Sequence, residues 1–137
     1  PFFDAALHAR GEVEVDPIAR AHLARMYGTD HHRVLDVVAD DPSLGARISA
    51  RPEIADIGAQ VVVAVVDEGA LTLTDIIDRR LALGTLGHVT ATEVDRVAAI
   101  AGPLLGWSGE ESAQRAAAEV DRRVAIERVW RARRAVS

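Results

Sequence analysis

Residues 53–84, EIADIGAQVVVAVVDEGALTLTDIIDRRLALG, decide the fold of this chain. The polar residues of the first half recur at gaps of three, four and seven positions, at Glu53, Asp56, Gln60 and Asp67. This spacing keeps them on one side of a helix with about 3.6 residues per turn. The apolar residues of the opposite side are Ile54, Ile57, Val61 and Val65. We therefore expect an amphipathic helix over residues 53–68, followed by Gly69, where helix propensity falls.

A second helix is predicted directly after Gly69. Thr72, followed by Asp75 three residues later, resembles a capping box, in which the hydroxyl accepts a hydrogen bond from a free amide of the first turn. Its apolar stripe at helical spacing consists of Leu73, Ile76, Ile77 and Leu81. Gly84 stands where a left-handed C-terminal cap is needed. Two short-linked amphipathic helices bury their stripes against each other, so this stretch predicts a helical hairpin at the centre of the domain.

Helix start and stop signals occur on both sides of this hairpin. Residues that can cap the first turn of a helix are Asp16, Thr29 or Asp30, Thr90 and Ser108. Glycine or proline ends helices at Gly28, Pro42 and Gly102-Pro103, and residues 43–48 fit one short turn. The seam expected in the last helix consists of Ala113, Ala116, Ala117, Val120 and Val124. These signals predict an all-α fold of about six helices in one compact domain.

Composition narrows the class of protein. The 137 residues suit one domain with a hydrophobic core, and 49% hydrophobic but only 4% aromatic residues favour a helical bundle. A net charge of -5 argues against a general nucleic-acid binder, which needs a positive surface. The absence of cysteine excludes disulfides and thiolate chemistry. No apolar run approaches the roughly 20 residues of a membrane span.

The periodicity of the apolar residues also predicts the domain boundaries. Residues 1–15 have no clear period and are interpreted as a linker or docking segment. Residues 16–130 form the helical domain, and residues 131–137 are expected to fray because the apolar stripe loses its register past Glu127. The chain begins at Pro1 rather than Met. We therefore expect it to be a piece of a longer cytoplasmic protein.

The residues themselves predict no catalytic, cofactor-binding or metal site. Gly84 and Gly87 come closest to a phosphate-binding turn, but they follow a helix rather than a strand, so an ordinary loop is expected. His32 and Asp36, with His31 adjacent, could share a metal ion, yet no further ligands are visible. We therefore expect neither group to bind a cofactor.

Charged groups near helix ends have simpler interpretations. The pairs Asp40-Asp41 and Glu110-Glu111 are expected to act as caps or solvated charges rather than as acid–base catalysts. His22, on an apolar flank, is expected to pack in the core or at a domain contact. The basic tail contains Arg128, Arg131, Arg133 and Arg134. It could contact anionic lipid or nucleic acid, but a solvated helix end is preferred, since arginine is favourable near a helix C-terminus.

Three motifs together resemble a known family. The first motif is an acidic residue after an apolar helix, followed by the pattern D-x-x-x-R-R. Glu68 matches the acidic residue, and the pattern is matched by Asp75, Arg79 and Arg80. The stretches HLARMYG (residues 22–28) and LGWS (residues 105–108) agree in order and spacing. The chain is therefore similar, over about residues 16–125, to the C-terminal helical domain of FAD-dependent glycerol-3-phosphate dehydrogenases. It departs from the family pattern at Leu81, where threonine is usual.

The resemblance implies an accessory domain of a flavoenzyme that oxidises glycerol 3-phosphate to dihydroxyacetone phosphate and passes electrons to quinone. FAD and substrate would be held by the preceding domains of the parent chain, which would be this domain's partners, and the domain alone would carry no catalytic centre. The parent would be cytoplasmic, with peripheral contact at the inner face of the cell membrane and homo-oligomer formation both left open. The alternative is a free-standing helical module for protein–protein interaction.

One structural ion pair is predicted. If the first central helix continues to residue 68, Glu68 falls within its apolar stripe, and Arg80 falls within the stripe of the second helix. Charges on apolar faces are costly unless paired, so we expect these two side chains to meet across the hairpin. Removing one partner should then cost roughly 3–5 kcal/mol. Asp75 and Arg79, one turn apart on the flank, should form only a weak surface pair.

Overall fold

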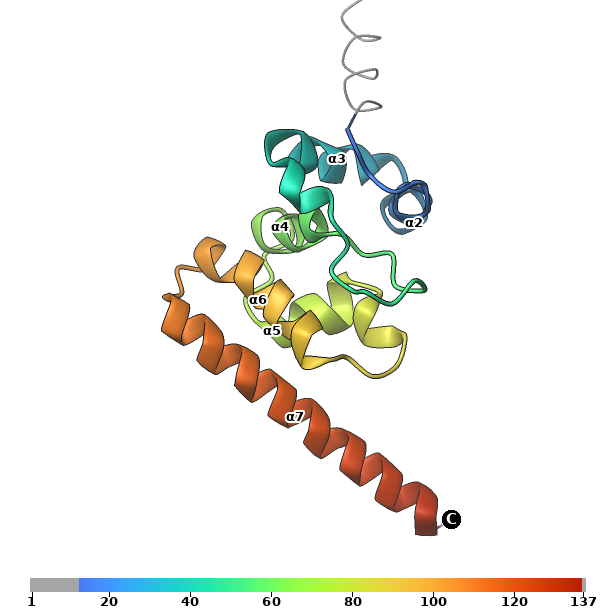
Figure 1. Ribbon diagram of the computed structural model, residues 1–137, viewed down its shortest axis with the longest axis vertical. Helices are drawn as coiled ribbons and strands as arrows, with labels where there is room; N and C mark the ends of the chain where they lie inside the picture. Colours follow the sequence, from blue (N-terminus) through green and yellow to red (C-terminus); the bar gives the residue numbers. More distant parts are fainter. Residues whose placement is uncertain (1–12, 137) are drawn as a thin grey trace, which may run out of the picture.

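The computed structural model describes residues 13–136. Its helices are stacked in layers along the long axis of Figure 1. Helices α2 (Pro17–Tyr27) and α3 (His31–Asp40) form one end, and α4 (Gly58–Val66) lies in the middle. Below it lie α5 (Leu73–Asp75) and α6 (Ala91–Leu104), and α7 (Gly109–Val136) crosses the other end. The described residues contain no strand, only one isolated bridge between Arg47 and Ile57, so the predicted all-α class is confirmed.

Short turns connect these helices. Turns of 3₁₀ helix cover Gly28–Asp30, Pro42–Gly45 and Leu83–Thr85, and a π-helical turn covers Ile76–Arg80. The turn expected over residues 43–48 is therefore shorter, and it starts one residue earlier. None of the described helices is long and apolar enough to cross a membrane.

Helix α4 is buried on both sides, which places the core. One side joins a cluster with α2 and α3 through Ala59 and Val63, and the other joins a cluster with α5 and α6 through Val61 and Ala64. A helix enclosed in this way is apolar all round, which explains the run VVVAVV. At its first residue, Gly58, an added Cβ would lie 3.0 Å from the Cδ1 of Ile100, so the helix enters the core at close range.

The prediction for the start of this helix was wrong. The helix begins at Gly58 rather than Glu53 and ends at Val66. Residues before it run extended, with Ile57 at φ -114 and ψ 161. Asp56 and Gln60, assigned to the polar side of an amphipathic helix, are both fully buried. The helical spacing in residues 53–60 arose from a different arrangement, in which an extended segment carries Asp56 into the interior.

The second central helix is interrupted. Thr72 caps it as predicted, since its Oγ1 accepts a hydrogen bond from the Asp75 amide at 3.0 Å. The α-helical part then gives way to the π turn, and Leu81 is already extended. Gly84 does not have the predicted left-handed conformation. An added Cβ there would lie 2.6 Å from the Ile77 carbonyl oxygen, so glycine is needed because two turns of backbone pack closely.

Most other capping predictions are confirmed. Asp16 accepts a hydrogen bond from the Ile18 amide at 2.8 Å, and Gly28 ends α2 with φ 56. Thr90 and Glu93 form both arms of a capping box, at 3.2 and 2.8 Å. Ser108 accepts a hydrogen bond from the Glu111 amide at 3.1 Å. Asp30 occupies the N-cap position of α3 without a side-chain hydrogen bond.

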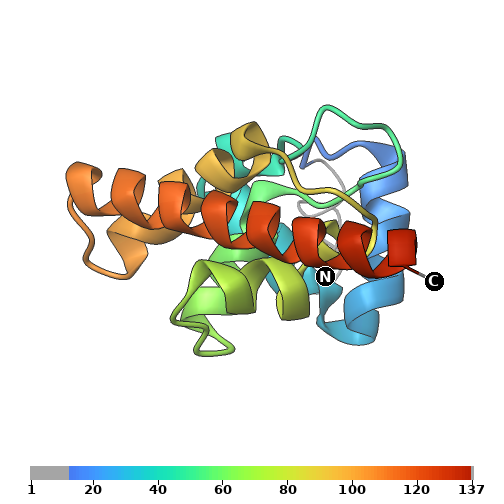
Figure 2. The same cartoon turned by 90° about the horizontal axis from the view of Figure 1, so that it is seen from below.

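Helix α7 differs from its prediction in two ways. Of the expected alanine seam, Ala116 is buried but Ala113 and Ala117 are exposed, and Glu119 is buried instead. The helix also continues to Val136, past the boundary drawn at residue 130. Its end extends below the other helices in Figure 1, and in Figure 2 the helix runs across the length of the molecule. Ser137 and residues 1–12 of the predicted linker lie outside the described residues.

Candidate functional site

The Asp56 carboxylate is fully buried in the domain. Its Oδ1 lies 2.8 Å from the Nε2 of His22 and accepts hydrogen bonds from the Gln60 side chain at 3.0 Å and the Ala82 amide at 3.2 Å. Its Oδ2 accepts a hydrogen bond from the Leu83 amide at 2.8 Å. A buried carboxylate with several donors is well compensated for the loss of water.

These donors come from segments that are distant in the chain. His22 belongs to α2, Gln60 to α4, and the two amides to the segment after the π turn. Asp56 therefore ties the α2 end of the molecule to the central hairpin. The sequence placed His22 in the core or at a domain contact, and it is nearly buried, with 12% of its side chain exposed. Asp56 itself was missed, because its helical spacing suggested an exposed side of a helix.

Tyr27 and Met26, both from the HLARMYG motif, lie near Gln60, which is one of the donors to this carboxylate. The Gln60 amide nitrogen is 3.8 Å from the Met26 sulfur, and the Gln60 oxygen accepts a hydrogen bond from the Ile57 amide at 2.8 Å. Burial, reinforced by the nearby charge of Glu68, raises the pKa of the Tyr27 hydroxyl to about 12. Gln60 opposes this shift but makes no hydrogen bond of standard geometry with the hydroxyl. The phenol is therefore neutral at physiological pH.

Glu68 and Arg80 lie together, but not in the apolar interior. The Nη1 of Arg80 is 3.3 Å from the Oε2 of Glu68, and the two side chains are 35% and 32% exposed. The contact involves one guanidinium nitrogen rather than two, and the Nε of Arg80 is buried without a partner. The Nε of Arg79 lies 3.6 Å from the Oδ1 of Asp75, with the Arg79 side chain 80% exposed.

A second buried carboxylate, Glu93, fastens the loop before α4 to the start of α6. Its oxygens accept hydrogen bonds from Arg51 Nη2 at 2.7 Å and Nε at 3.0 Å, and from the Ser49 hydroxyl. Burial alone would raise the pKa of Glu93, but the hydrogen bonds from Arg51, Ser49 and the Thr90 amide outweigh it and lower that pKa to about 2. Glu93 therefore stays ionised and paired at physiological pH.

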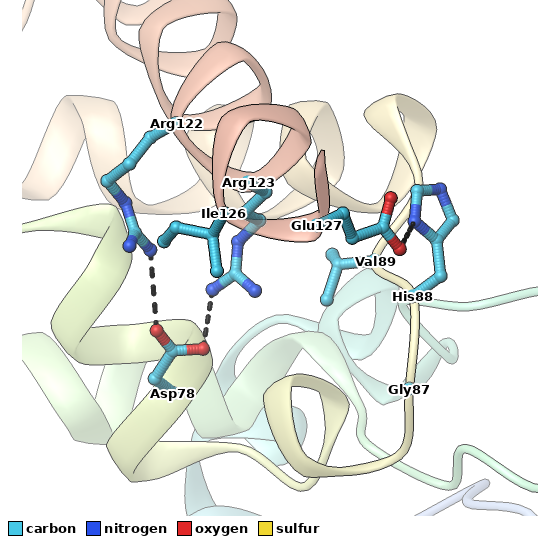
Figure 3. Close-up of a pocket in the computed structure, with 8 residues that line it drawn as sticks. All are labelled: Asp78, Gly87, His88, Val89, Arg122, Arg123, Ile126 and Glu127. Carbon is cyan, nitrogen blue, oxygen red and sulfur yellow. Dashed lines mark hydrogen bonds and ion pairs between the residues drawn. The ribbon is translucent and has the colours of Figure 1, made fainter. Parts of the chain in front are cut away.

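An open cleft of about 370 Å³ lies between α7 and the π turn (Figure 3). Asp78 binds two arginines of α7, with Arg123 Nη2 at 2.5 Å and Arg122 Nη2 at 3.4 Å. At the other side of the cleft, His88 Nδ1 lies 3.0 Å from Glu127 Oε1. The same arginines bind the buried Glu119, at 2.6 and 2.9 Å. The charged groups drawn in the cleft therefore neutralise one another and hold α7 in place.

The residues considered for metal or phosphate binding make other contacts in the described part of the chain. Within residues 13–136 no three His, Asp or Glu side chains are grouped as metal ligands. The Nδ1 of His31 bonds the Gly28 carbonyl at 2.6 Å, and its ring lies 4.1 Å from that of His32. Gly84 is packed against backbone, and Gly87 follows a 3₁₀ turn rather than a strand. This loop does not fit a dinucleotide phosphate, and we derive no cofactor contact from it.

The fold and its interior carboxylates define a class: a small all-helical domain whose buried charged groups cross-link its own segments. A family model described as the C-terminal domain of alpha-glycerophosphate oxidase matches residues 4–112. The chain therefore belongs to this family of C-terminal domains. The family match ends at Ser112, so it includes only the first four residues of α7.

Similarity to individual proteins supports the same family assignment. The chain is 34% identical, over 110 residues, to proteins named glycerol-3-phosphate dehydrogenase 2 from Mycobacterium tuberculosis and Mycobacterium bovis. The match covers 80% of this chain but only 17% of each relative. No solved structure matches the chain.

Proposed function

We propose that this chain is the accessory domain of an FAD-dependent glycerol-3-phosphate dehydrogenase. The parent enzyme would oxidise glycerol 3-phosphate to dihydroxyacetone phosphate and pass the electrons to quinone. The observation that carries the proposal is the family match over residues 4–112, supported by 34% identity to glycerol-3-phosphate dehydrogenase 2. In this proposal FAD and substrate are bound by the preceding domains, and the present domain has a structural and interdomain role.

The position of the family motifs supports a structural role. His22, from HLARMYG, binds Asp56, and Arg80, from D-x-x-x-R-R, binds Glu68. Both contacts join one segment of the domain to another, and neither leaves the carboxylate oriented toward an open cavity. The motif residues thus maintain the shape with which the domain meets the rest of the parent chain.

We also propose a cytoplasmic parent in peripheral contact with the inner face of the cell membrane. The physical reason is the electron acceptor, because quinones are dissolved in the bilayer and an enzyme that reduces them must reach its surface. A homo-oligomeric parent is compatible with this arrangement.

The test compares three proteins: the chain alone, the full-length parent, and the parent lacking residues 13–136. Oxidation of glycerol 3-phosphate is followed with an artificial electron acceptor, and bound flavin by its visible spectrum. We expect the full-length parent to turn over, the truncated parent to lose flavin at a lower temperature, and the chain alone to show neither flavin nor turnover. Turnover by the chain alone would refute the non-catalytic role, and an inert full-length parent would refute the activity.

A further inference from the structure

Helix α2 has an apolar side that is wider than the part covered by the domain. At about 100° per residue, Ile18, His22 and Met26 fall within an arc of about 80°, and Ala19 and Leu23 fall within about the next 60°. Ala19 and Leu23 are fully buried, whereas Ile18 and Met26 are 60% and 41% exposed. No charged residue of α2 falls within these two arcs. One edge of the apolar side is therefore buried, and the other edge, which we call the α2 face (Ile18, His22 and Met26), is open.

His22 is the polar group of the α2 face, and the buried carboxylate orients its ring. Asp56 accepts hydrogen bonds from three other N–H groups, so the Nε2 of His22, 2.8 Å from it, carries the proton of their contact. In a neutral imidazole the other ring nitrogen, Nδ1, is then an acceptor. Nδ1 makes no hydrogen bond among the described residues, and it is not one of their atoms that are buried without a partner. The α2 face thus presents one oriented acceptor to its surroundings.

The chemistry of the α2 face selects a kind of partner. An acceptor nitrogen between the side chains of Ile18 and Met26 fits an apolar surface that carries one N–H or O–H donor. Protein surfaces combine these two features, with an apolar centre and a few hydrogen bonds. A phosphate group offers acceptor oxygens, which do not complement Nδ1. The partner that fits is therefore another protein surface.

The course of the chain indicates which protein surface this is. The chain covers 17% of each relative, and its family consists of C-terminal domains, so most of such a parent precedes the match that starts at residue 4. The chain enters the described domain beside α2, where the Nη2 of Arg20 donates a hydrogen bond to the Val13 carbonyl at 2.5 Å. A preceding domain is therefore tethered near the α2 face, which raises its effective concentration there to about the millimolar range. A second copy of the chain has no such tether.

We infer that the α2 face docks on the preceding domain of the parent chain. Ile18 and Met26 lie against an apolar patch of that domain, and the Nδ1 of His22 accepts a hydrogen bond from a donor within the patch. Asp56 is a positioning residue in this arrangement, because it holds the ring of His22 without touching the partner. The inference gives a surface to the interdomain role proposed above, and in that respect it rests on the proposed function.

Hydrogen exchange tests the contact in the full-length parent. Docking stabilises α2 against local opening, so its amides (Pro17–Tyr27) should exchange roughly tenfold more slowly in the parent than in the chain alone. The same measurement on variants then identifies the side chains that carry the contact.

Two matched pairs of substitutions test the apolar residues. Ile18→Gln with Met26→Gln should return the exchange of α2 in the parent to the rate of the chain alone. The control, Val66→Gln with Leu71→Gln, changes residues outside α2 that are 56% and 71% exposed, and it should keep the slow exchange. Both pairs should leave the melting temperature of the chain alone close to that of wild type, because all four side chains are exposed.

His22→Gln separates the surface acceptor from the internal anchor. The glutamine amide can still donate to Asp56, but it places no acceptor at the position of Nδ1. The chain alone should therefore keep its melting temperature, while the slow exchange of α2 in the parent should be weakened roughly three- to tenfold. Nitrogen NMR of the wild-type chain at pH 8 should show Nε2 protonated and Nδ1 unprotonated.

Several outcomes would overturn the inference. Equal exchange of α2 in the parent and in the chain alone would do so, as would equal effects of the two matched pairs. Unchanged exchange in His22→Gln, or a protonated Nδ1 beside an unprotonated Nε2, would remove His22 from the contact. A dimer of the chain alone that only the Ile18, Met26 pair abolishes would make a second copy the occupant.

The proposed function is tested separately from this surface. A full-length parent that is inert toward glycerol 3-phosphate but has slow exchange in α2 would refute the activity and support the docking face. A parent that turns over but exchanges α2 as fast as the chain alone would support the activity and refute the docking face.

Discussion

Two carboxylates twelve positions apart, Asp56 and Glu68, have different surroundings. Asp56 is fully buried and has four donors from three segments, whereas Glu68 is one-third exposed and has a single contact of 3.3 Å to Arg80. Water solvates Glu68 whether or not its partner is present, but nothing except the protein satisfies Asp56. From this comparison we expect the number of protein donors, rather than the charge alone, to set how much each carboxylate stabilises the domain.

The largest effect is expected for Asp56→Ala. The substitution removes the acceptor of the buried Leu83 amide and of the Gln60 side chain, so it should lower the free energy of unfolding by about 3–5 kcal/mol. Urea denaturation measures this change. The control is Asp67→Ala, which breaks a surface pair with Arg33 and should cost about 1 kcal/mol or less. Equal losses in the two variants would contradict the comparison.

Glu93 extends the comparison to pH. Its folded-state pKa of about 2 lies below the ordinary value of 4.5, so its contribution is present above pH 4.5 and is lost as the pH falls toward 2. We expect acid to remove about 2–3 kcal/mol of the free energy of unfolding across that window. Urea titrations at several pH values measure the loss. In Glu93→Gln this part of the pH dependence should disappear, and an unchanged slope in the variant would refute the assignment.

The smallest effect is expected for Arg80→Ala. Because both partners are about one-third exposed, the pair should contribute about 1 kcal/mol or less, rather than the 3–5 kcal/mol expected for a buried pair. Arg79→Ala, at the more exposed Asp75 contact, serves as the reference and should be near zero. Melting temperatures of the two variants measure the difference. A loss of several kcal/mol in Arg80→Ala alone would show that Glu68 and Asp56 are not as different as their exposure indicates.

The pairing of Glu68 with Arg80 was predicted from a helix that does not extend so far. Helix α4 ends at Val66, so Glu68 lies after the helix and not within its apolar stripe. The two residues meet because the chain reverses between α4 and α5. Their side chains lie 3.3 Å apart and are about one-third exposed rather than buried.

The end of α7 shows a similar limit. In the sequence, the apolar stripe of the last helix loses its helical spacing past Glu127, and this change predicts a frayed tail. In the structure the helix continues to Val136, and residues 128–136 are all exposed. Loss of the stripe thus marked the end of packing rather than the end of the helix, and only the position of the core could reveal the difference.

What the sequence determined by itself was local: the all-α class, the apolar stripes and the caps at Asp16, Thr72 and Thr90. The atoms of each cap lie within three residues of one another, so short-range spacing is enough to find them. Only the tertiary structure decided that Asp56 is buried and which groups donate hydrogen bonds to it. One donor is Gln60, and the others lie 26, 27 and 34 positions away in the chain. Periodicity within one segment cannot reveal such donors, because they come together only when separate segments pack around the same carboxylate.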